Sequence, residues 1–294
     1  MASTTTKATG EIRPALVLGG SGHLGAMLAA FWPRDAALRL HSTKPNPGFM
    51  VFDLTLDPAK AVAAMTGAGA VICLSGVIPA RVAQSADVFS RNTDLALCAI
   101  ESAHLAGAGR VFVASSAAVY GGARGILDET TACLPVSEYG AAKLAMEEAA
   151  LARAAELGHP VTMLRIGNVA GADAILGGWY DGMKIDQFAD GTTPRRSYIG
   201  PKTLAQVIHA LSIQDDLPEV LNIAAPGAIE MGKLLDAAGL PWLARTPDKG
   251  VIPQVALSTK RLESLVPFAQ ERESPEIMVG EWREFQARKT KALQ

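Results

Sequence analysis

The residues of this 294-residue chain best suited to chemistry are a tyrosine and a lysine, Tyr139 and Lys143, in the segment SEYGAAKLAMEEAA. Four residues apart on a strongly helical stretch, they lie on one side of the helix, with Cβ atoms about 5–6 Å apart. An ammonium beside a phenol favours the phenolate and lowers the pKa of the tyrosine from about 10. The pair could therefore transfer a proton near neutral pH. Taken alone, the same spacing also fits an ordinary solvated helix face.

A serine pair, Ser115 and Ser116, follows the strand predicted over Arg110–Ala114. Open α/β sheets hold their ligands at the carboxyl edge of the strands. A hydroxyl at that edge can hydrogen-bond a substrate oxygen while the tyrosine transfers its proton. The alternative is that the two serines only terminate the strand.

Three glycines, Gly19, Gly22 and Gly25, lie in VLGGSGHLG between a short apolar strand and an amphipathic helix. Glycine permits tight turns and close approach of the backbone to a ligand. The helix N-terminus offers N–H groups and a partial positive charge to a pyrophosphate. No Lys-Ser or Lys-Thr follows, which excludes a Walker loop and leaves a dinucleotide site or a structural turn. In the dinucleotide interpretation His23 and Leu24 also contact the cofactor.

The second predicted strand ends in LRLHSTKP and lacks the acidic residue that usually binds the ribose about 20 residues after the glycines. Ser42, Thr43 and Lys44 stand there instead. They can hydrogen-bond and neutralise a 2′-phosphate, which a carboxylate would repel. The sequence therefore favours NADP as cofactor, with NAD as the alternative. An ordinary polar turn is the competing interpretation.

Short apolar runs alternate with Ala-rich helical stretches through the first two thirds of the chain. This alternation predicts βαβ units, and continuously apolar strands fit a parallel sheet covered on both faces. The expected fold class is α/β, a doubly wound parallel sheet (Rossmann fold). Strands are predicted over Ala15–Leu18, Leu38–His41, Met50–Leu54, Val71–Leu74, Arg110–Ala114 and Val161–Ile166, and helices over Leu24–Trp32, Phe89–Ala106 and Tyr139–Leu157.

The regular alternation stops after Gly171, where loops and short elements are expected. Ser274 followed by Pro275 is a helix-start signal. The expected organisation is a flexible N-terminus (1–12), an NAD(P)-binding Rossmann domain (13–171) and a small substrate-binding lobe with interleaved Rossmann elements (172–294). The elements predicted in this last part are helices Leu204–Leu211, Met231–Ala238 and Ser274–Ala287 and strand Val220–Ile223.

Composition argues against several classes of partner. The formal net charge is -2 with no lysine or arginine stripe, which is unlike a nucleic-acid-binding protein. No uncharged apolar run approaches the ~20 residues that span a bilayer, and no secretory leader is seen, so a cytoplasmic location without membrane binding is expected. Neither the five histidines nor the cysteines cluster, so no metal site is expected. The cysteines, expected to be reduced thiols, are Cys73, Cys98 and Cys133.

Together these motifs resemble the extended short-chain dehydrogenase/reductases of the NAD-dependent epimerase/dehydratase type. The resemblance covers most of the chain and is strongest from Leu16 to Gly171. GGSGHLG is similar to the family's G-x-x-G-x-x-G, and FDLTL to its third-strand motif. SSAAVYG and EYGAAK resemble its two catalytic motifs, and LRIGNVAG resembles L-R-x-x-N-V-Y-G. Asn92 matches the family's helix-four asparagine.

The resemblance implies roles for individual residues. Tyr139 exchanges the proton, Lys143 holds the tyrosine anionic and binds the nicotinamide ribose, and Ser116 orients the substrate oxygen. DGTTPRRSYIGPKTLA is similar to the segment whose arginine grips a nucleotide-sugar phosphate in relatives, and Arg196 matches that arginine. The further positions implied are Asp53, Leu54, Leu74 and Ser75 at the cofactor, and Asn168 and Tyr198 at the substrate.

The implied activity is that of an NAD(P)-dependent oxidoreductase or epimerase that transfers hydride between nicotinamide and a carbinol or ketone of a sugar-like substrate. An epimerase would retain the cofactor, whereas a reductase would release it in each cycle. Ala117 and Ala118 stand where sugar-nucleotide dehydratases carry Asp-Glu, so dehydration is not expected. Two alternatives stay open: an NADPH-dependent reductase of a small non-sugar carbonyl, and a cofactor-binding sensor without catalysis. The resemblance also implies a homodimer through Phe89–Ala106 and Tyr139–Leu157, the alternative being that these helices pack only on their own sheet.

Overall fold

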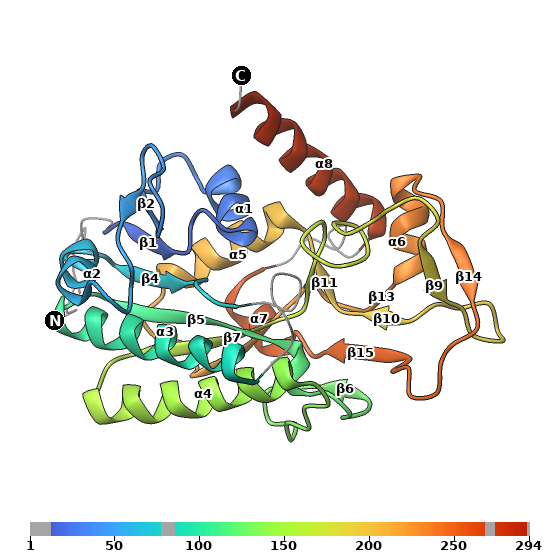
Figure 1. The fold of residues 1–294 in the computed structure, drawn as a ribbon, viewed down its shortest axis with the longest axis horizontal. Helices are drawn as coiled ribbons and strands as arrows, with labels where there is room; N and C mark the ends of the chain where they lie inside the picture. The colour runs from blue at the N-terminus through green and yellow to red at the C-terminus, as the bar shows by residue number, and fades with distance from the viewer. Residues whose placement is uncertain (1–12, 78–85, 268–273, 293–294) are drawn as a thin grey trace, which may run out of the picture.

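The computed structural model describes residues 13–77, 86–267 and 274–292; the predicted flexible N-terminus, 1–12, lies outside them. A seven-stranded parallel sheet forms the centre of the fold (Figure 1). Its strands are β1 (Ala15–Leu18), β2 (Leu38–Ser42), β3 (Met50–Val51), β4 (Ala70–Cys73), β5 (Arg110–Ser116), β7 (Val161–Ile166) and β12 (Val220–Ile223). They follow the order β12-β7-β5-β4-β1-β2-β3. Because the chain winds outward in both directions from β1 and β4, the predicted doubly wound α/β fold is confirmed.

Helices cover both faces of this sheet (Figure 1). One face carries α1 (His23–Phe31) and α5 (Pro201–Ser212), and the other carries α2 (Pro58–Met65), α3 (Ala86–Leu105) and α4 (Glu138–Leu157). Along β1, Val17 packs into the core beneath α1 and α5, whereas Leu16 and Leu18 pack beneath α2 and α3. Burial of each of these side chains stabilises the folded state by roughly 1.5–3 kcal/mol. Burial on both sides explains the continuous apolar runs.

Most of the remaining elements form a smaller lobe beside the sheet, whereas α7 packs against β12 of the central sheet and α8 closes the fold (Figure 1). A four-stranded sheet, order β13-β10-β15-β6, joins β6, the next strand after β5 in the chain, to three strands of the C-terminal part. A pairing between β8 and β11 sets Asn168 opposite Tyr198. The elements are β6 (Ile126–Leu127), β8 (Asn168–Val169), β9 (Lys184–Asp186), β10 (Arg195–Arg196), β11 (Tyr198–Ile199), β13 (Ile229–Glu230), α6 (Met231–Ala238), β14 (Leu243–Arg245), β15 (Gln254–Leu257), α7 (Lys260–Leu265) and α8 (Pro275–Ala292).

The last helix, α8, ties the lobe to the sheet. The Phe285 ring lies 6.5 Å from the Phe31 ring of α1, centre to centre. The Glu281 carboxylate accepts the backbone N–H and the hydroxyl of Thr203 in the first turn of α5, at 3.0 and 2.6 Å. A carboxylate in that place satisfies N–H groups that a helix start leaves unpaired. The C-terminal helix therefore contacts both helices on this face of the sheet.

Several element limits differ from those predicted. The strand expected over Met50–Leu54 ends at Val51, because the Asp53 carboxylate accepts the hydroxyl and N–H of Thr55 and closes a turn. Helix α2 is absent from the predicted elements, although Asp57-Pro58 is a helix-start signal. The last helix runs to residue 292 rather than 287. Within the described ranges, no helix is long and apolar enough to cross a membrane, and no group of three or more metal-ligating side chains could hold an ion.

Candidate active site

Ser116, Tyr139 and Lys143 lie together where β5 ends and α4 begins. The Ser116 hydroxyl hydrogen-bonds to the Tyr139 phenol and accepts the backbone N–H of Ala118 at 3.2 Å. The Lys143 Nζ lies 6.0 Å from the centre of the Tyr139 ring. The structure therefore brings the three predicted catalytic side chains into one place, and their roles are taken up below as a proposal.

Helix α4 approaches the end of β5 closely because of a glycine. A Cβ on Gly140 would lie 2.5 Å from the Ala118 carbonyl oxygen, so a larger residue would push the helix away. The Ser137 hydroxyl caps the helix by accepting the N–H of Gly140 at 3.1 Å. The buried Phe89 ring packs edge-on against Tyr139, with 5.6 Å between ring centres. Phe89 was predicted only as the start of a helix.

Burial dominates the electrostatics of the pair. It raises the pKa of Tyr139, against the hydrogen bond from Ser116, which lowers it. Burial also lowers the pKa of Lys143 to about 8. The Lys143 ammonium donates to the Ala114 carbonyl oxygen at 2.8 Å. The expected lowering of the tyrosine pKa by the lysine is therefore not found: burial raises the Tyr139 pKa, the opposing effect comes from Ser116, and the Lys143 ammonium is bound to a carbonyl.

The glycine loop is packed too tightly for side chains at two of the predicted positions. Gly19 has φ +75°, and a Cβ there would lie 2.9 Å from the Ser75 nitrogen. A Cβ on Gly25 would lie 2.5 Å from the Gly20 carbonyl oxygen. The N–H of Gly22 donates to the Gly19 carbonyl at 2.9 Å and closes the turn. These glycines let β1, the loop and α1 approach one another, as a dinucleotide cradle requires.

Helix α1 begins at His23, with Gly22 as an N-cap that supplies no side-chain hydrogen bond. The first N–H groups of a helix have no acceptor within the helix, and this end of the dipole is positive. The His23 ring stacks on Phe285 of α8 at 5.9 Å, and Leu24 packs against the core beneath α1. This end of α1 therefore fits the phosphates of a dinucleotide.

The turn after β4 borders the glycine loop and contains the predicted positions Leu74 and Ser75, both half-buried. Buried Asn92 of α3 holds this turn. Its Oδ1 accepts the N–H of Val77 at 2.9 Å, and its Nδ2 donates to the Val77 carbonyl at 3.3 Å. The asparagine singled out by the family resemblance thus fixes backbone beside the predicted cofactor site.

His41 links the glycine loop to two strands and was predicted only as a strand end. The N–H of Gly19 donates to His41 Nδ1 at 3.1 Å, and His41 Nε2 lies 2.9 Å from the Phe52 carbonyl oxygen. The ring is 1% exposed. Since Nδ1 accepts a hydrogen bond, the ring is neutral and carries its proton on Nε2. Its partners lie 22 and 11 residues away, beyond the reach of local sequence patterns.

This arrangement predicts acid sensitivity. Burial lowers the pKa of His41, and likewise those of His159 and His209, from the model-compound value of 6.5. Below pH 6.5 the unfolded chain therefore binds more protons than the folded protein does. The histidines contribute their whole share to the free energy of unfolding above pH 6.5, and this contribution falls as the pH drops below 6.5. Urea unfolding on both sides of pH 6.5 measures this loss. We expect His41→Gln to flatten the pH dependence; an unchanged slope would contradict the assignment.

The predicted ribose-binding residues differ in exposure. Ser42 is buried, and its hydroxyl accepts the backbone N–H of Lys44 at 3.2 Å. Thr43 and Lys44 are exposed. The side chains able to meet an adenosine phosphate from solvent are therefore those of Thr43 and Lys44, while Ser42 shapes the turn.

Asp53 and Leu54, expected near the adenine, follow β3. The Asp53 carboxylate is engaged within its own turn through Thr55, and it pairs with Arg91 of α3 at 3.6 Å. These hydrogen bonds, first from Thr55, lower the pKa of Asp53. Leu54 is buried between α2 and α3. Asp53 therefore orders the backbone at this edge of the site.

The predicted substrate-binding residues fall in two environments. Tyr198 is 1% exposed in the core of the lobe, and its hydroxyl donates to Asp173 at 3.0 Å. Asn168 hydrogen-bonds Tyr198 through its side chain. Arg196 is half-buried on β10, and its Nη1 donates to the Arg195 carbonyl oxygen at 2.8 Å. Within the described residues no carboxylate pairs with Arg196, and desolvation lowers its pKa.

Comparison with known proteins agrees with this geometry. The family model described as "NAD dependent epimerase/dehydratase family" matches residues 15–224. The chain belongs to this family of enzymes. The match runs from the start of β1 to the end of β12 and so covers the whole central sheet.

Individual relatives are more distant. A UDP-glucose 4-epimerase from Azospirillum brasilense is 35% identical over 98 residues, which span 33% of this chain and only 28% of that protein. The solved UDP-N-acetylglucosamine 4-epimerase from Methanobrevibacter ruminantium superposes with a TM-score of 0.74 at 19% identity, covering 95% of this chain and 99% of that one. The UDP-glucose 4-epimerase from Thermus thermophilus, solved with NAD, gives 0.70 at 20% identity, covering 92% and 99%. At these identities the two structures establish the shared fold.

Proposed function

We propose that this protein is an NAD(P)-dependent oxidoreductase or epimerase that moves hydride between nicotinamide and a carbinol or ketone carbon of a sugar-like substrate. The observation that carries the proposal is the Ser116–Tyr139 hydrogen bond with Lys143 on the next turn of the same helix. In this proposal residues 13–171 bind the dinucleotide and 172–294 form the substrate lobe. Membership of an enzyme family and the retained trio weigh against a non-catalytic sensor.

The residues present fit a dinucleotide. Two glycines leave no room for a Cβ where loop, strand and helix meet, and the uncapped N-terminus of α1 follows them. When bound, the nicotinamide would supply or accept the hydride. The backbone from Gly19 to Gly25 would hold the phosphates, and Lys143 would hold the nicotinamide ribose.

The proton is handled by Tyr139. Its raised pKa keeps the phenol protonated at neutral pH, so it can donate to a substrate oxygen during reduction. Ser116 would hold the same oxygen by hydrogen bond. In the reverse direction Tyr139 would take the proton from a carbinol, and a charged Lys143 would stabilise the phenolate. A Lys143 pKa of about 8 leaves most of the ammonium charged at neutral pH.

NADP is the cofactor we favour, because Thr43 and Lys44 are exposed where a ribose-binding acid is usual. The Thermus thermophilus relative was solved with NAD, so NAD is the alternative. The ratio of the dissociation constants for NADPH and NADH tests the preference. We further propose a cytoplasmic homodimer joined through α3 and α4.

Arg196 supports a substrate with an anionic group. Its guanidinium is half-buried without a carboxylate partner among the described residues. For a nucleotide sugar, Arg196→Gln is expected to raise KM about 10- to 100-fold, the value of one charge-assisted hydrogen bond, with a smaller change in kcat. Steady-state kinetics measure both constants.

The matched control is Arg195→Gln, whose exposed side chain donates to the Ala228 carbonyl. It should leave KM unchanged. If Arg196→Gln leaves KM unchanged as well, while an uncharged carbonyl compound is turned over, the second candidate is supported. That candidate is a reductase of small non-sugar carbonyls.

A further inference from the structure

A buried carboxylate, Glu147, lies one helical turn after Lys143 on α4 and is 2% exposed. The Ser115 hydroxyl donates to its Oε1 at 2.5 Å. Arg165 forms an ion pair with it, with Nη2 and Oε2 2.7 Å apart. A buried carboxylate is expensive unless it is paired and fully hydrogen-bonded, and this one is both. Its partners lie on two different strands.

Those strands are neighbours in the central sheet. The β5–β7 pairing sets Ser115 opposite Arg165, directly before Ser116. The Arg165 Nε also donates to both carboxylate oxygens, each at 3.1 Å. Glu147 therefore binds the end of β5, the end of β7 and the helix that carries Tyr139 and Lys143. This one carboxylate therefore contacts both elements that carry the candidate catalytic residues, β5 with Ser116 and α4 with Tyr139 and Lys143.

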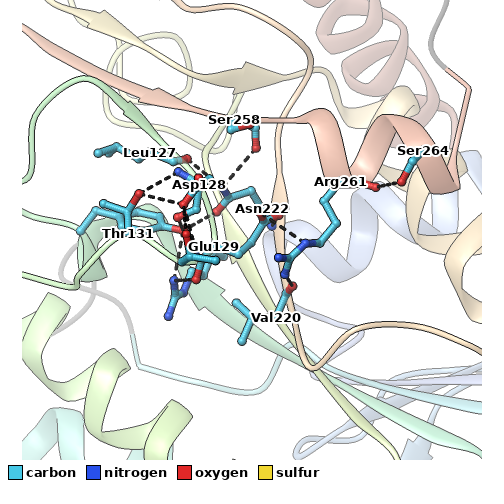
Figure 2. Close-up of polar contacts among 12 residues, drawn as sticks. Leu127, Asp128, Glu129, Thr131, Val220, Asn222, Ser258, Arg261 and Ser264 are labelled. Atoms are coloured by element: carbon cyan, nitrogen blue, oxygen red, sulfur yellow. Dashed lines mark hydrogen bonds and ion pairs between the residues drawn. The ribbon is translucent and has the colours of Figure 1, made fainter.

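Arg165 is itself fixed from its other side. Its Nη1 donates to the Tyr120 hydroxyl at 3.1 Å, and the guanidinium carbon lies 4.9 Å from the centre of the Tyr120 ring. The Tyr120 hydroxyl donates to Asn222 Oδ1 at 2.8 Å. Figure 2 shows how the network continues: the backbone N–H of Asn222 donates to the Glu129 carboxylate, which forms an ion pair with Arg261 of α7. The ion pair is thus anchored to β12 and α7 and cannot turn freely.

We propose that Glu147 is a positioning residue of the active site, which sets Ser116 through Ser115 and sets Lys143 through the shared turn of α4. The proposal rests on the proposed function only for its kinetic effect. Two features separate it from a purely structural ion pair. Ser115 is covalently joined to Ser116, and the Glu147 charge raises the pKa of Lys143 against burial, as does Cys73 at the end of β4, which every variant below retains.

The two effects are separable by mutation. Ser115→Ala removes the hydrogen bond to the strand and keeps the charge, whereas Glu147→Gln removes the charge and weakens that hydrogen bond. Each is expected to lower kcat about 10- to 100-fold with little change in KM, since misplacement by about 1 Å has effects of that size. Only Glu147→Gln should move the alkaline limb of the pH profile to lower pH, because Lys143 then loses its proton earlier. Both substitutions affect the Ser115–Glu147 hydrogen bond, so the fold-decrease in kcat of the double variant should be smaller than the product of the two single fold-decreases.

A second readout needs no substrate. The chain has four tyrosines, so the ultraviolet titration of the Tyr139 phenol is the difference between a protein and its Tyr139→Phe counterpart. Ser115→Ala should raise this titration midpoint, because a displaced Ser116 no longer stabilises the phenolate. Glu148→Gln, at the exposed neighbouring position of α4, is the matched control and should change nothing. Circular dichroism checks that each variant is folded.

The outcomes are distinct. Folded Ser115→Ala with the wild-type kcat and the wild-type tyrosine titration would overturn the positioning role, whatever becomes of Glu147→Gln. A shifted titration in a protein that turns over no carbonyl or carbinol would support the positioning role while refuting the proposed function.

Discussion

Tyr139→Phe is expected to lower kcat by about 10²- to 10⁴-fold, the usual contribution of a positioned acid or base. The substitution removes one hydroxyl and keeps the ring that packs edge-on against Phe89, so the fold and the dinucleotide affinity should be retained. The Ser116 hydroxyl loses its partner but keeps the N–H of Ala118. Rapid-mixing kinetics with reduced cofactor and a carbonyl substrate measure the loss.

The matched control for this substitution is Tyr180→Phe. Tyr180 is 60% exposed in the lobe, and removal of its hydroxyl should leave kcat unchanged. No loss in Tyr139→Phe would show that the proton comes from another group, and equal losses in both variants would show that the loss is not specific to the Tyr139 hydroxyl.

Arg165→Met is expected to lower the free energy of unfolding by about 3–5 kcal/mol, because it leaves the buried Glu147 carboxylate without its counter-ion. Domains of this kind are stable by about 5–15 kcal/mol, so the loss is a large fraction of the total. The Arg165 side chain is 8% exposed and that of Glu147 is 2% exposed, so water compensates little. Urea unfolding followed by circular dichroism measures the shift in midpoint.

Arg153→Met tests whether burial is the reason. Arg153 pairs with Glu101 and Glu156 at 2.8 and 2.9 Å, distances close to that of the buried pair, but its side chain is 38% exposed. Exposed pairs contribute about 0–1 kcal/mol, so this variant should unfold nearly as the wild type does. A similar small loss in Arg165→Met would mean that the buried pair is not needed for stability.

The trio could be predicted from sequence because its information is local. Tyr139 and Lys143 are four residues apart on one helix, and Ser116 ends a strand whose apolar run is plain. The short strands β10, β13 and β15 could not be predicted, since two to four residues carry too little pattern and their partners lie far along the chain.

Other residues needed the tertiary structure. Glu147 lies four residues after Lys143, so helical spacing places it on the face of the pair, but its partner Arg165 lies 18 residues away on another strand and could not be predicted. His41 resembles any polar strand end until its two backbone partners are seen. Tyr198, predicted to grip substrate, lies in the lobe core with its hydroxyl on Asp173, so we assign it to the support of the lobe.

Single-turnover kinetics test Tyr139-centred hydride transfer most directly. The protein is saturated in turn with NADP and with NAD and then mixed with a panel of UDP-hexoses and simple carbinols, while the absorbance of reduced nicotinamide is followed. We predict that the wild type forms reduced nicotinamide with at least one substrate, and that Tyr139→Phe binds the same dinucleotide but reacts at least about 10²-fold more slowly. Failure to bind either dinucleotide, or equal rates in the two proteins, would contradict the proposed chemistry.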